Sequence, residues 1–194
     1  MRLFSIIIIS STLLFAQLDN SATITKTGTT AAQFLKIGVD ARASAMGNAF
    51  TAMKGDISSM YWNPAGLTSI GRMETMFMNS SWLAGIQFTH AAFAINLNAA
   101  GVIGFSMTSL SVPEDMVRTV EKPNGTGEYF DAGDLAMNFT YARKLTDQFS
   151  IGGNIKYIRQ NIWHASASSV AADLGALFVT PFNGIRLGAS LSNY

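Results

Sequence analysis

The stretch FDAGDLAMNFTYARKL, residues 130–145, alternates large apolar residues with small or polar ones. The large residues are Leu135, Met137, Phe139 and Tyr141, and between them lie Asp134, Ala136, Asn138, Thr140 and Ala142. A period of two residues is typical of a β-strand with two different faces. The stretch therefore predicts a strand with one apolar face and one small, polar face.

The same alternation recurs along the second half of the chain. It is clear at residues 149–157, 170–178 and 185–191, and noisier at 73–79, 86–97 and 102–109. Within residues 86–97 the apolar phase shifts between Phe88 and Phe93, which predicts a β-bulge there. About seven strands are expected, each near the ~10 residues that a tilted strand needs to cross a membrane.

Composition narrows the class of all-β protein. The chain is 48% hydrophobic and 13% charged, has a mean hydropathy of +0.24 and contains no cysteine. Soluble domains carry about 25% charged residues, whereas the 39 residues from Thr75 to Pro113 carry none. These features favour an antiparallel transmembrane β-barrel, in which strand pairing satisfies the backbone, over a soluble β-sandwich, whose strands also alternate.

The predicted connections differ in length. Residues 98–100, 144–147 and 181–184 form short turns, whereas 111–129 and 161–167 form longer loops, the first of them rich in charge. Short turns at one end and long polar loops at the other are typical of outer-membrane barrels.

The N-terminal part reads differently. Residues 1–16 have the pattern of a signal peptide, with a positive charge at Arg2, then an apolar stretch, then the small residue Ala16 at the cleavage position. The alternative is an uncleaved membrane anchor. Apolar residues spaced 4, 3, 4 and 3 then predict a helix over about 40–54, ending near Gly55. They are Val39, Ala43, Met46, Phe50 and Met53.

Two quoted segments carry a family resemblance. Residues 32–50, AQFLKIGVDARASAMGNAF, and 60–67, MYWNPAGL, resemble the N-terminal signature of the PorV/PorQ family, and residues 118–164 also resemble it. That family is grouped with FadL-like outer-membrane barrels, which hold an N-terminal hatch inside 14 strands. The resemblance implies that residues 17–71 form a hatch or plug containing the motif Asn63, Pro64, Ala65 and Gly66, and that residues 72–194 begin the barrel. Because seven strands are odd in number and too few, we expect the N-terminal fragment of a longer protein.

The resemblance also implies a function. It implies a non-enzymatic component of type IX secretion in the bacterial outer membrane, whose partners are lipid, secretion-machinery proteins and cargo that carries a C-terminal signal. The alternative is a FadL-like channel for small hydrophobic solutes. Nucleic acid is not expected as a partner, since 13 basic against 12 acidic residues leave no basic block.

Candidate site residues follow from the alternation. Six polar residues share the small, polar face and should form a network in the lumen, which holds the hatch or lines a solute path. They are Asp134, Asn138, Asn154, Lys156, Asp173 and Arg186. His90 and His164 lie 74 positions apart without a nucleophile motif, so both are predicted to be structural. No motif for catalysis, a cofactor or a metal is recognisable.

Overall fold

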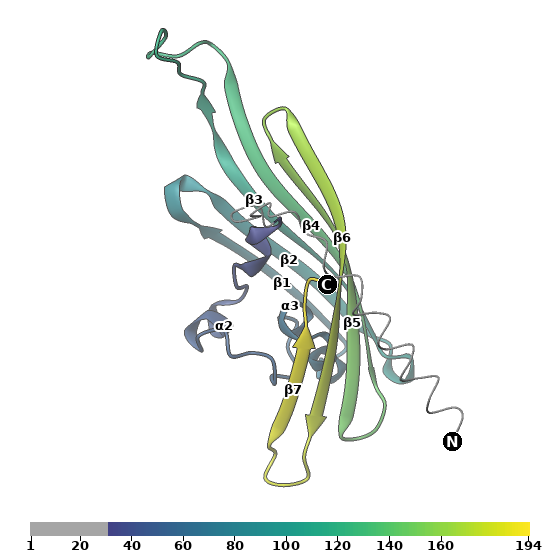
Figure 1. Ribbon diagram of the computed structural model, residues 1–194. Coiled ribbons are helices and arrows are strands. Elements are labelled where there is room, and N and C mark those ends of the chain that lie inside the picture. The colour runs from purple at the N-terminus through teal and green to yellow at the C-terminus, as the bar shows by residue number, and fades with distance from the viewer. Residues whose placement is uncertain (1–30) are drawn as a thin grey trace, which may run out of the picture. The chain divides into compact units, whose positions relative to one another are not determined.

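The computed structural model describes residues 31–194, and the predicted signal peptide at 1–16 lies outside them (Figure 1). Seven strands pair in sequence order, each antiparallel to the next, in one open, curved sheet. They are β1 Met73–Ser81, β2 Gln87–Asn96, β3 Val102–Met116, β4 Tyr129–Lys144, β5 Phe149–Ile162, β6 Ala165–Val179 and β7 Arg186–Leu191. The predicted antiparallel all-β architecture and the number of strands are confirmed for this part of the chain.

The predicted bulge in the second strand is wrong. β2 pairs with β1 and β3 in continuous register, and the irregularity lies in β3, between Val112 and Asp115. Phe88 points to the same face as His90 and is 1% exposed, whereas Phe93 lies on the opposite face. A large residue on the inward face therefore gave the appearance of a phase shift.

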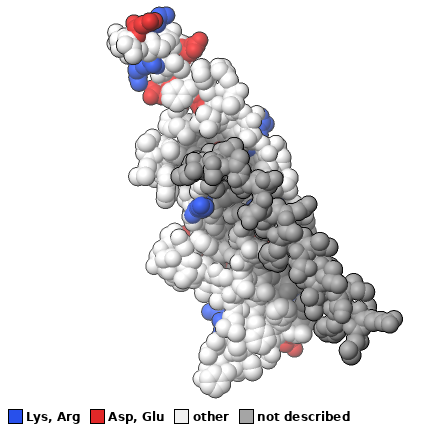
Figure 2. Space-filling view, in the orientation of Figure 1, with Lys and Arg blue, Asp and Glu red and all other residues white. Residues whose placement is uncertain are grey.

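The loops also differ from the prediction. The expected long loop at 161–167 is wrong, because β5 and β6 extend until only Trp163 and His164 connect them. The other long connection shrinks to residues 117–128, since β3 continues to Met116. Charged residues gather around it at the top of the view in Figure 2. They include Glu114, Asp115, Arg118, Glu121, Lys122 and Glu128.

Residues 33–70, here called the hatch segment, form short helical turns against one face of the sheet (Figure 1). The turns are η1 Gln33–Lys36, α2 Ala41–Ala45, α3 Ser59–Trp62 and η2 Pro64–Ser69. A single helix over 40–54 is therefore wrong, because Gly47 and Asn48 take left-handed φ values of 64° and 66° and end α2. No helix among the described residues is long and apolar enough to cross a membrane.

The two faces of the sheet have the composition that the alternation predicted. Phe139 is 54% exposed on the outward face, while its neighbour Thr140 is fully buried beneath the hatch segment. Two apolar clusters join the hatch segment to the inward face. One packs Met60 and Leu67 against Ala94 and neighbouring strand residues, and the other packs Phe34 and Leu35 against strand residues that include Ala136.

Candidate functional site

The hatch segment rests on strand glycines. A Cβ atom at Gly152 of β5 would lie 2.6 Å from the carbonyl carbon of Pro64 and 2.7 Å from the nitrogen of Ala65. On the neighbouring strand β6, a Cβ at Gly175 would collide with the Asn63 side chain and lie 2.8 Å from Pro64 Cδ. Gly152 and Gly175 are register partners, so together they form a flat seat for the Asn63 to Gly66 motif.

Two further glycines extend this seat along the sheet. A Cβ at Gly188 of β7 would lie 2.8 Å from the Cα of Ala52, and one at Gly104 of β3 would collide with the Met60 side chain. At Gly188 only a residue without a Cβ allows such close approach of backbone, whereas the atom nearest to a Cβ at Gly104 is the end of the flexible Met60 side chain. The glycines thus define where the hatch segment meets the sheet, an interface that we call the seam.

Asn63 ties the motif to the strands. Its backbone is extended, with φ −158° and ψ 101°, as the following proline favours. Its amide nitrogen donates to the carbonyl oxygens of Thr51, at 2.7 Å, and of Ala176 in β6, at 3.0 Å. Its amide oxygen accepts from the backbone N–H of Ala65, which begins η2. One buried side chain therefore connects two parts of the hatch segment with the sheet.

A buried ion pair lies beside this seat. Lys156 Nζ is 2.7 Å from Asp173 Oδ2, and both side chains are almost fully buried. Asn154 donates to the same carboxylate, at 2.7 Å, and also to the backbone carbonyl of Met60 in α3, at 2.9 Å. Since a buried charge needs a partner and hydrogen bonds, this arrangement satisfies Asp173 and connects it to the hatch segment.

The polar chain continues across the sheet. Thr140 donates to Asn154 Oδ1 at 2.7 Å, and the Asn138 amide donates to Thr140 at 3.2 Å and to Ser106 at 3.3 Å. Asn138, Asn154, Lys156 and Asp173 thus belong to one hydrogen-bonded group that spans β3 to β6.

The other two predicted network residues lie apart from this group. Asp134 accepts a hydrogen bond from Gln160 at 3.1 Å, and Gln160 also accepts from the backbone of Ala32. Arg186 of β7 lies 3.9 Å from the sulfur of Met53. The structure therefore brings together four of the six residues that the alternation placed on one face.

Tyr61 and His90 meet above the polar chain. Tyr61 donates to the carbonyl oxygens of Leu35 and Ile37, and its ring stands edge-on to His90 at 6.2 Å. Burial, followed by the negative charge of Asp173, raises the pKa of the Tyr61 hydroxyl well above its usual range. Tyr61 therefore stays a neutral donor that holds the first turn of the hatch segment.

The contacts of the two histidines favour structural roles. His90 Nδ1 lies 2.8 Å from Thr108 Oγ1, and His164 stacks on Trp163 in the turn between β5 and β6. Among residues 31–194, no group of three or more His, Cys, Asp or Glu side chains is placed to hold a metal ion.

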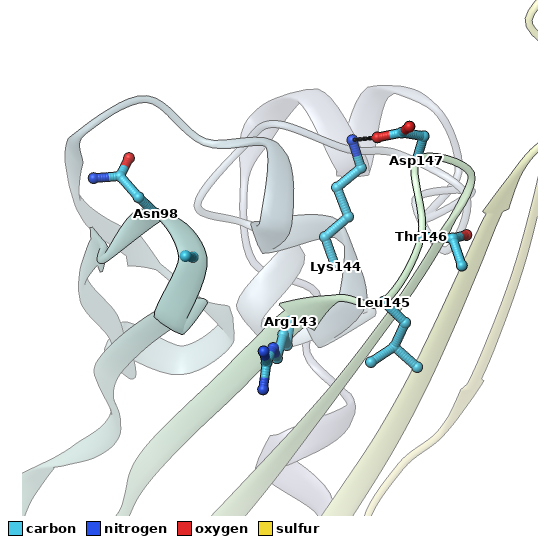
Figure 3. Close-up of a pocket in the computed structure, with 7 residues that line it drawn as sticks. Asn98, Arg143, Lys144, Leu145, Thr146 and Asp147 are labelled. Atoms are coloured by element: carbon cyan, nitrogen blue, oxygen red, sulfur yellow. Dashed lines mark ion pairs between the residues drawn. The ribbon is translucent and has the colours of Figure 1, made fainter.

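A hollow of about 470 Å³ lies at the turns between β2 and β3 and between β4 and β5. Figure 3 shows Arg143 and Lys144 pointing to opposite sides there, with Lys144 paired to Asp147 at 3.4 Å. This hollow is open and carries charges of both signs, so we do not take it as a candidate site.

Sequence reasoning missed the seat, Thr140 and Tyr61. The signal for the seat was present, because Gly152, Gly175 and Gly188 all fall on the small, polar side of their alternating stretches. No pattern identified Tyr61, since a tyrosine in a turn-rich segment has no period that assigns its contacts.

One protein family matches most of the chain. The family described as type IX secretion system protein PorV matches residues 20–184, which cover the hatch segment, strands β1 to β6 and the seam except for Gly188 on β7. No curated protein matches the chain.

Proposed function

Because the chain belongs to the PorV family of type IX secretion system proteins, we propose that it is a non-enzymatic outer-membrane protein that handles secreted cargo. Involvement in type IX secretion follows from the family.

The outward face supports a position in the membrane. The outward side chains of β4 and β5 are apolar or glycine over one continuous stretch. This stretch begins where Arg159 pairs with Leu135 and ends where Arg143 pairs with Ile151. Eight residues at about 3.3 Å each cover about 26 Å along the strands, or about 20 Å in height at a tilt near 40°. Long arginine side chains can reach from the edges of such a band to lipid headgroups.

Aromatic residues lie near both edges of this band. Trp82 and Trp163 occupy turns at one end, and Tyr141, whose hydroxyl donates to the Ala100 carbonyl, lies near the other. Aromatic girdles at both interfaces are typical of outer-membrane barrels.

The seated hatch segment carries the proposal of cargo handling. The motif backbone lies directly on Gly152, the Asn63 and Pro64 side chains lie on Gly175, and the two hollows beside Lys156 measure about 10 and 240 Å³. Both volumes are below the roughly 300–1,000 Å³ of a typical ligand pocket. We infer that the protein acts by docking cargo and machinery with the hatch seated. The FadL-like alternative would require the hatch to move.

A disulfide across the seam tests this proposal. Thr68 Oγ1 donates to Ser150 Oγ at 2.9 Å, and the chain contains no native cysteine, so Thr68→Cys with Ser150→Cys can lock the hatch to β5. We would complement a strain that lacks the protein with the full-length locked variant and measure cargo at the cell surface. The single cysteine variants serve as controls.

Cargo should be lost from the surface of the deletion strain and restored equally by the locked and single-cysteine variants. Normal cargo export in the deletion strain would refute the proposal. If the locked variant failed while its reduced form worked, hatch movement would be required and the channel alternative would gain support.

A further inference from the structure

Asn138 has one polar atom that the protein does not satisfy. Its side chain is 7% exposed, and its amide nitrogen donates to Ser106 and Thr140, yet Oδ1 has no hydrogen-bond partner among the described residues. Leaving a buried acceptor without a partner costs about 1–3 kcal/mol. Such groups are rare in folded proteins and need an explanation.

A small cavity lies next to this residue. Its volume is about 10 Å³, and its lining includes Leu35 and Tyr61 of the hatch segment together with Thr108, Asn138 and Lys156 of the strands. A cavity needs roughly 10–15 Å³ of such space to hold a water molecule. The space therefore suits a single water and is too small for an organic ligand.

The lining supplies the partners that a water needs. Asn138 and Lys156 are register partners on β4 and β5, so their side chains stand side by side on the inward face. Lys156 Nζ lies 2.9 Å from Asp173 Oδ1 and 2.7 Å from Oδ2, and it donates to Asn193 Oδ1 at 2.9 Å. When the two carboxylate oxygens share one ammonium proton, the third proton is left for a water. A water between the two can accept from Lys156 and donate to Asn138 Oδ1.

A metal cation fits this cavity poorly. Lys156 lines it, and its ion-pair partner Asp173 does not. A second positive charge in a buried space would be repelled by Lys156, whereas a neutral molecule that both donates and accepts meets both side chains.

A larger hollow lies beside the cavity. It measures about 240 Å³, shares Leu35, Tyr61 and Lys156 with the cavity, and also contacts Trp62 and Asn193. The three shared side chains place the two hollows next to each other.

We propose that the seam holds one structural water, bound by Asn138 Oδ1 and Lys156 Nζ beneath Tyr61. This water links the hydrogen bonds of Asn138 with the ion pair of Lys156 and Asp173. It would add a second connection between Asn138 and the ion pair, beside the direct route through Thr140 and Asn154. The inference does not depend on which cargo the protein handles.

High-resolution density of the full-length protein tests the inference directly. We expect a peak at about 2.7–3.2 Å from both Asn138 Oδ1 and Lys156 Nζ. In Asn138→Leu, which lacks the acceptor, the peak should disappear. The inference is overturned if the wild type shows no peak, if Lys156 bonds Asn138 directly, or if the peak persists in Asn138→Leu.

A second test uses NMR on the wild-type protein, so its result does not depend on whether any variant folds. Cross-relaxation from a long-lived water should reach the methyl group of Ala136, which lines the cavity. Ala142 is the matched control, because it lies on the same strand face but is fully buried in an apolar cluster. Equal signals, or none, at the two methyl groups would overturn the proposal.

Discussion

Adding one methyl group to the seat should partly unseat the hatch segment. In Gly152→Ala the new Cβ would start 2.6–2.8 Å from three backbone atoms of Pro64 and Ala65. Ordinary contact begins at 3.4 Å, so the motif must retreat by about 0.8 Å. Backbone atoms cannot rotate away as a side chain can, so the clash must be relieved by moving the hatch or the strand.

The expected cost is about 1–3 kcal/mol, the usual range for overpacking a well-packed site. If this free energy destabilises only the state in which the hatch segment is seated on the sheet, the population of the unseated state rises about 5- to 150-fold. Ser150 is 7% exposed and is covered by Thr68, and residues 1–194 contain no cysteine, so a Ser150→Cys thiol reports unseating once any cysteine beyond these residues has been replaced. The rate of thiol labelling of the purified full-length protein should rise by the same factor.

Gly153→Ala is the matched control. The next residue along β5 faces outward, and its new Cβ would lie 3.4 Å from the Asp173 carbonyl oxygen, which is ordinary contact. Its labelling rate should change by no more than about twofold, as for a surface substitution. Equal labelling rates in Gly152→Ala and Gly153→Ala would refute the claim that the glycine seat positions the hatch.

Four further predictions address the membrane face, the ion pair and the hatch motif. Phe139→Arg should destabilise the inserted protein by about 2–4 kcal/mol in denaturant titration, and Tyr129→Arg, on the same face near the charged loop, by under about 1 kcal/mol; equal losses would contradict the proposed band. Lys156→Met should cost about 3–5 kcal/mol, because it leaves the Asp173 carboxylate buried without its cation, and the double variant with Asp173→Leu should recover part of that stability; no recovery would mean that the pair does not act as a unit. The full-length protein should stay in the outer-membrane fraction after carbonate or high-salt washing, and recovery as a soluble protein would rule out the barrel. Pro64→Leu should speed labelling of Ser150→Cys while insertion is retained, and failure to insert would place the motif in the structural core.

The alternation predicted the sheet because large and small residues separate cleanly on most strands. At residues 135–142 every large residue faces outward and every small or polar one faces the hatch segment. The rule failed at Phe88, since hydrophobic periodicity does not distinguish an aromatic residue on the inward face from a change of phase. The rule also made the hairpin around Trp163 too short, because small residues such as Ser166 and Ala167 were assigned to a loop but pair with β5.

The site was harder to predict, for a physical reason. Alternation assigns a residue to a face but does not show what covers that face. Asn138 and Arg186 share the polar side, yet Asn138 lies under the hatch segment in a hydrogen-bonded chain, while the Arg186 side chain lies outside that chain, 3.9 Å from the sulfur of Met53. The difference depends on where residues 33–70 lie, and their short turns carry no long period.

The contacts of the seam fix the position of the hatch segment on the sheet, but they add little free energy to its attachment. A hydrogen bond such as that from Asn154 to the Met60 carbonyl adds only about 0.5–1.5 kcal/mol net, and a buried ion pair roughly offsets its own desolvation. Displacing the hatch by a fraction of an ångström would nevertheless leave buried partners unsatisfied, and the glycines prevent any larger side chain from filling the gap. The same contacts therefore fix one seated position without making it very stable. Because Gly152 meets the backbone of Pro64 and Ala65, Gly152→Ala should disturb the hatch more than loss of any single hydrogen bond across the seam.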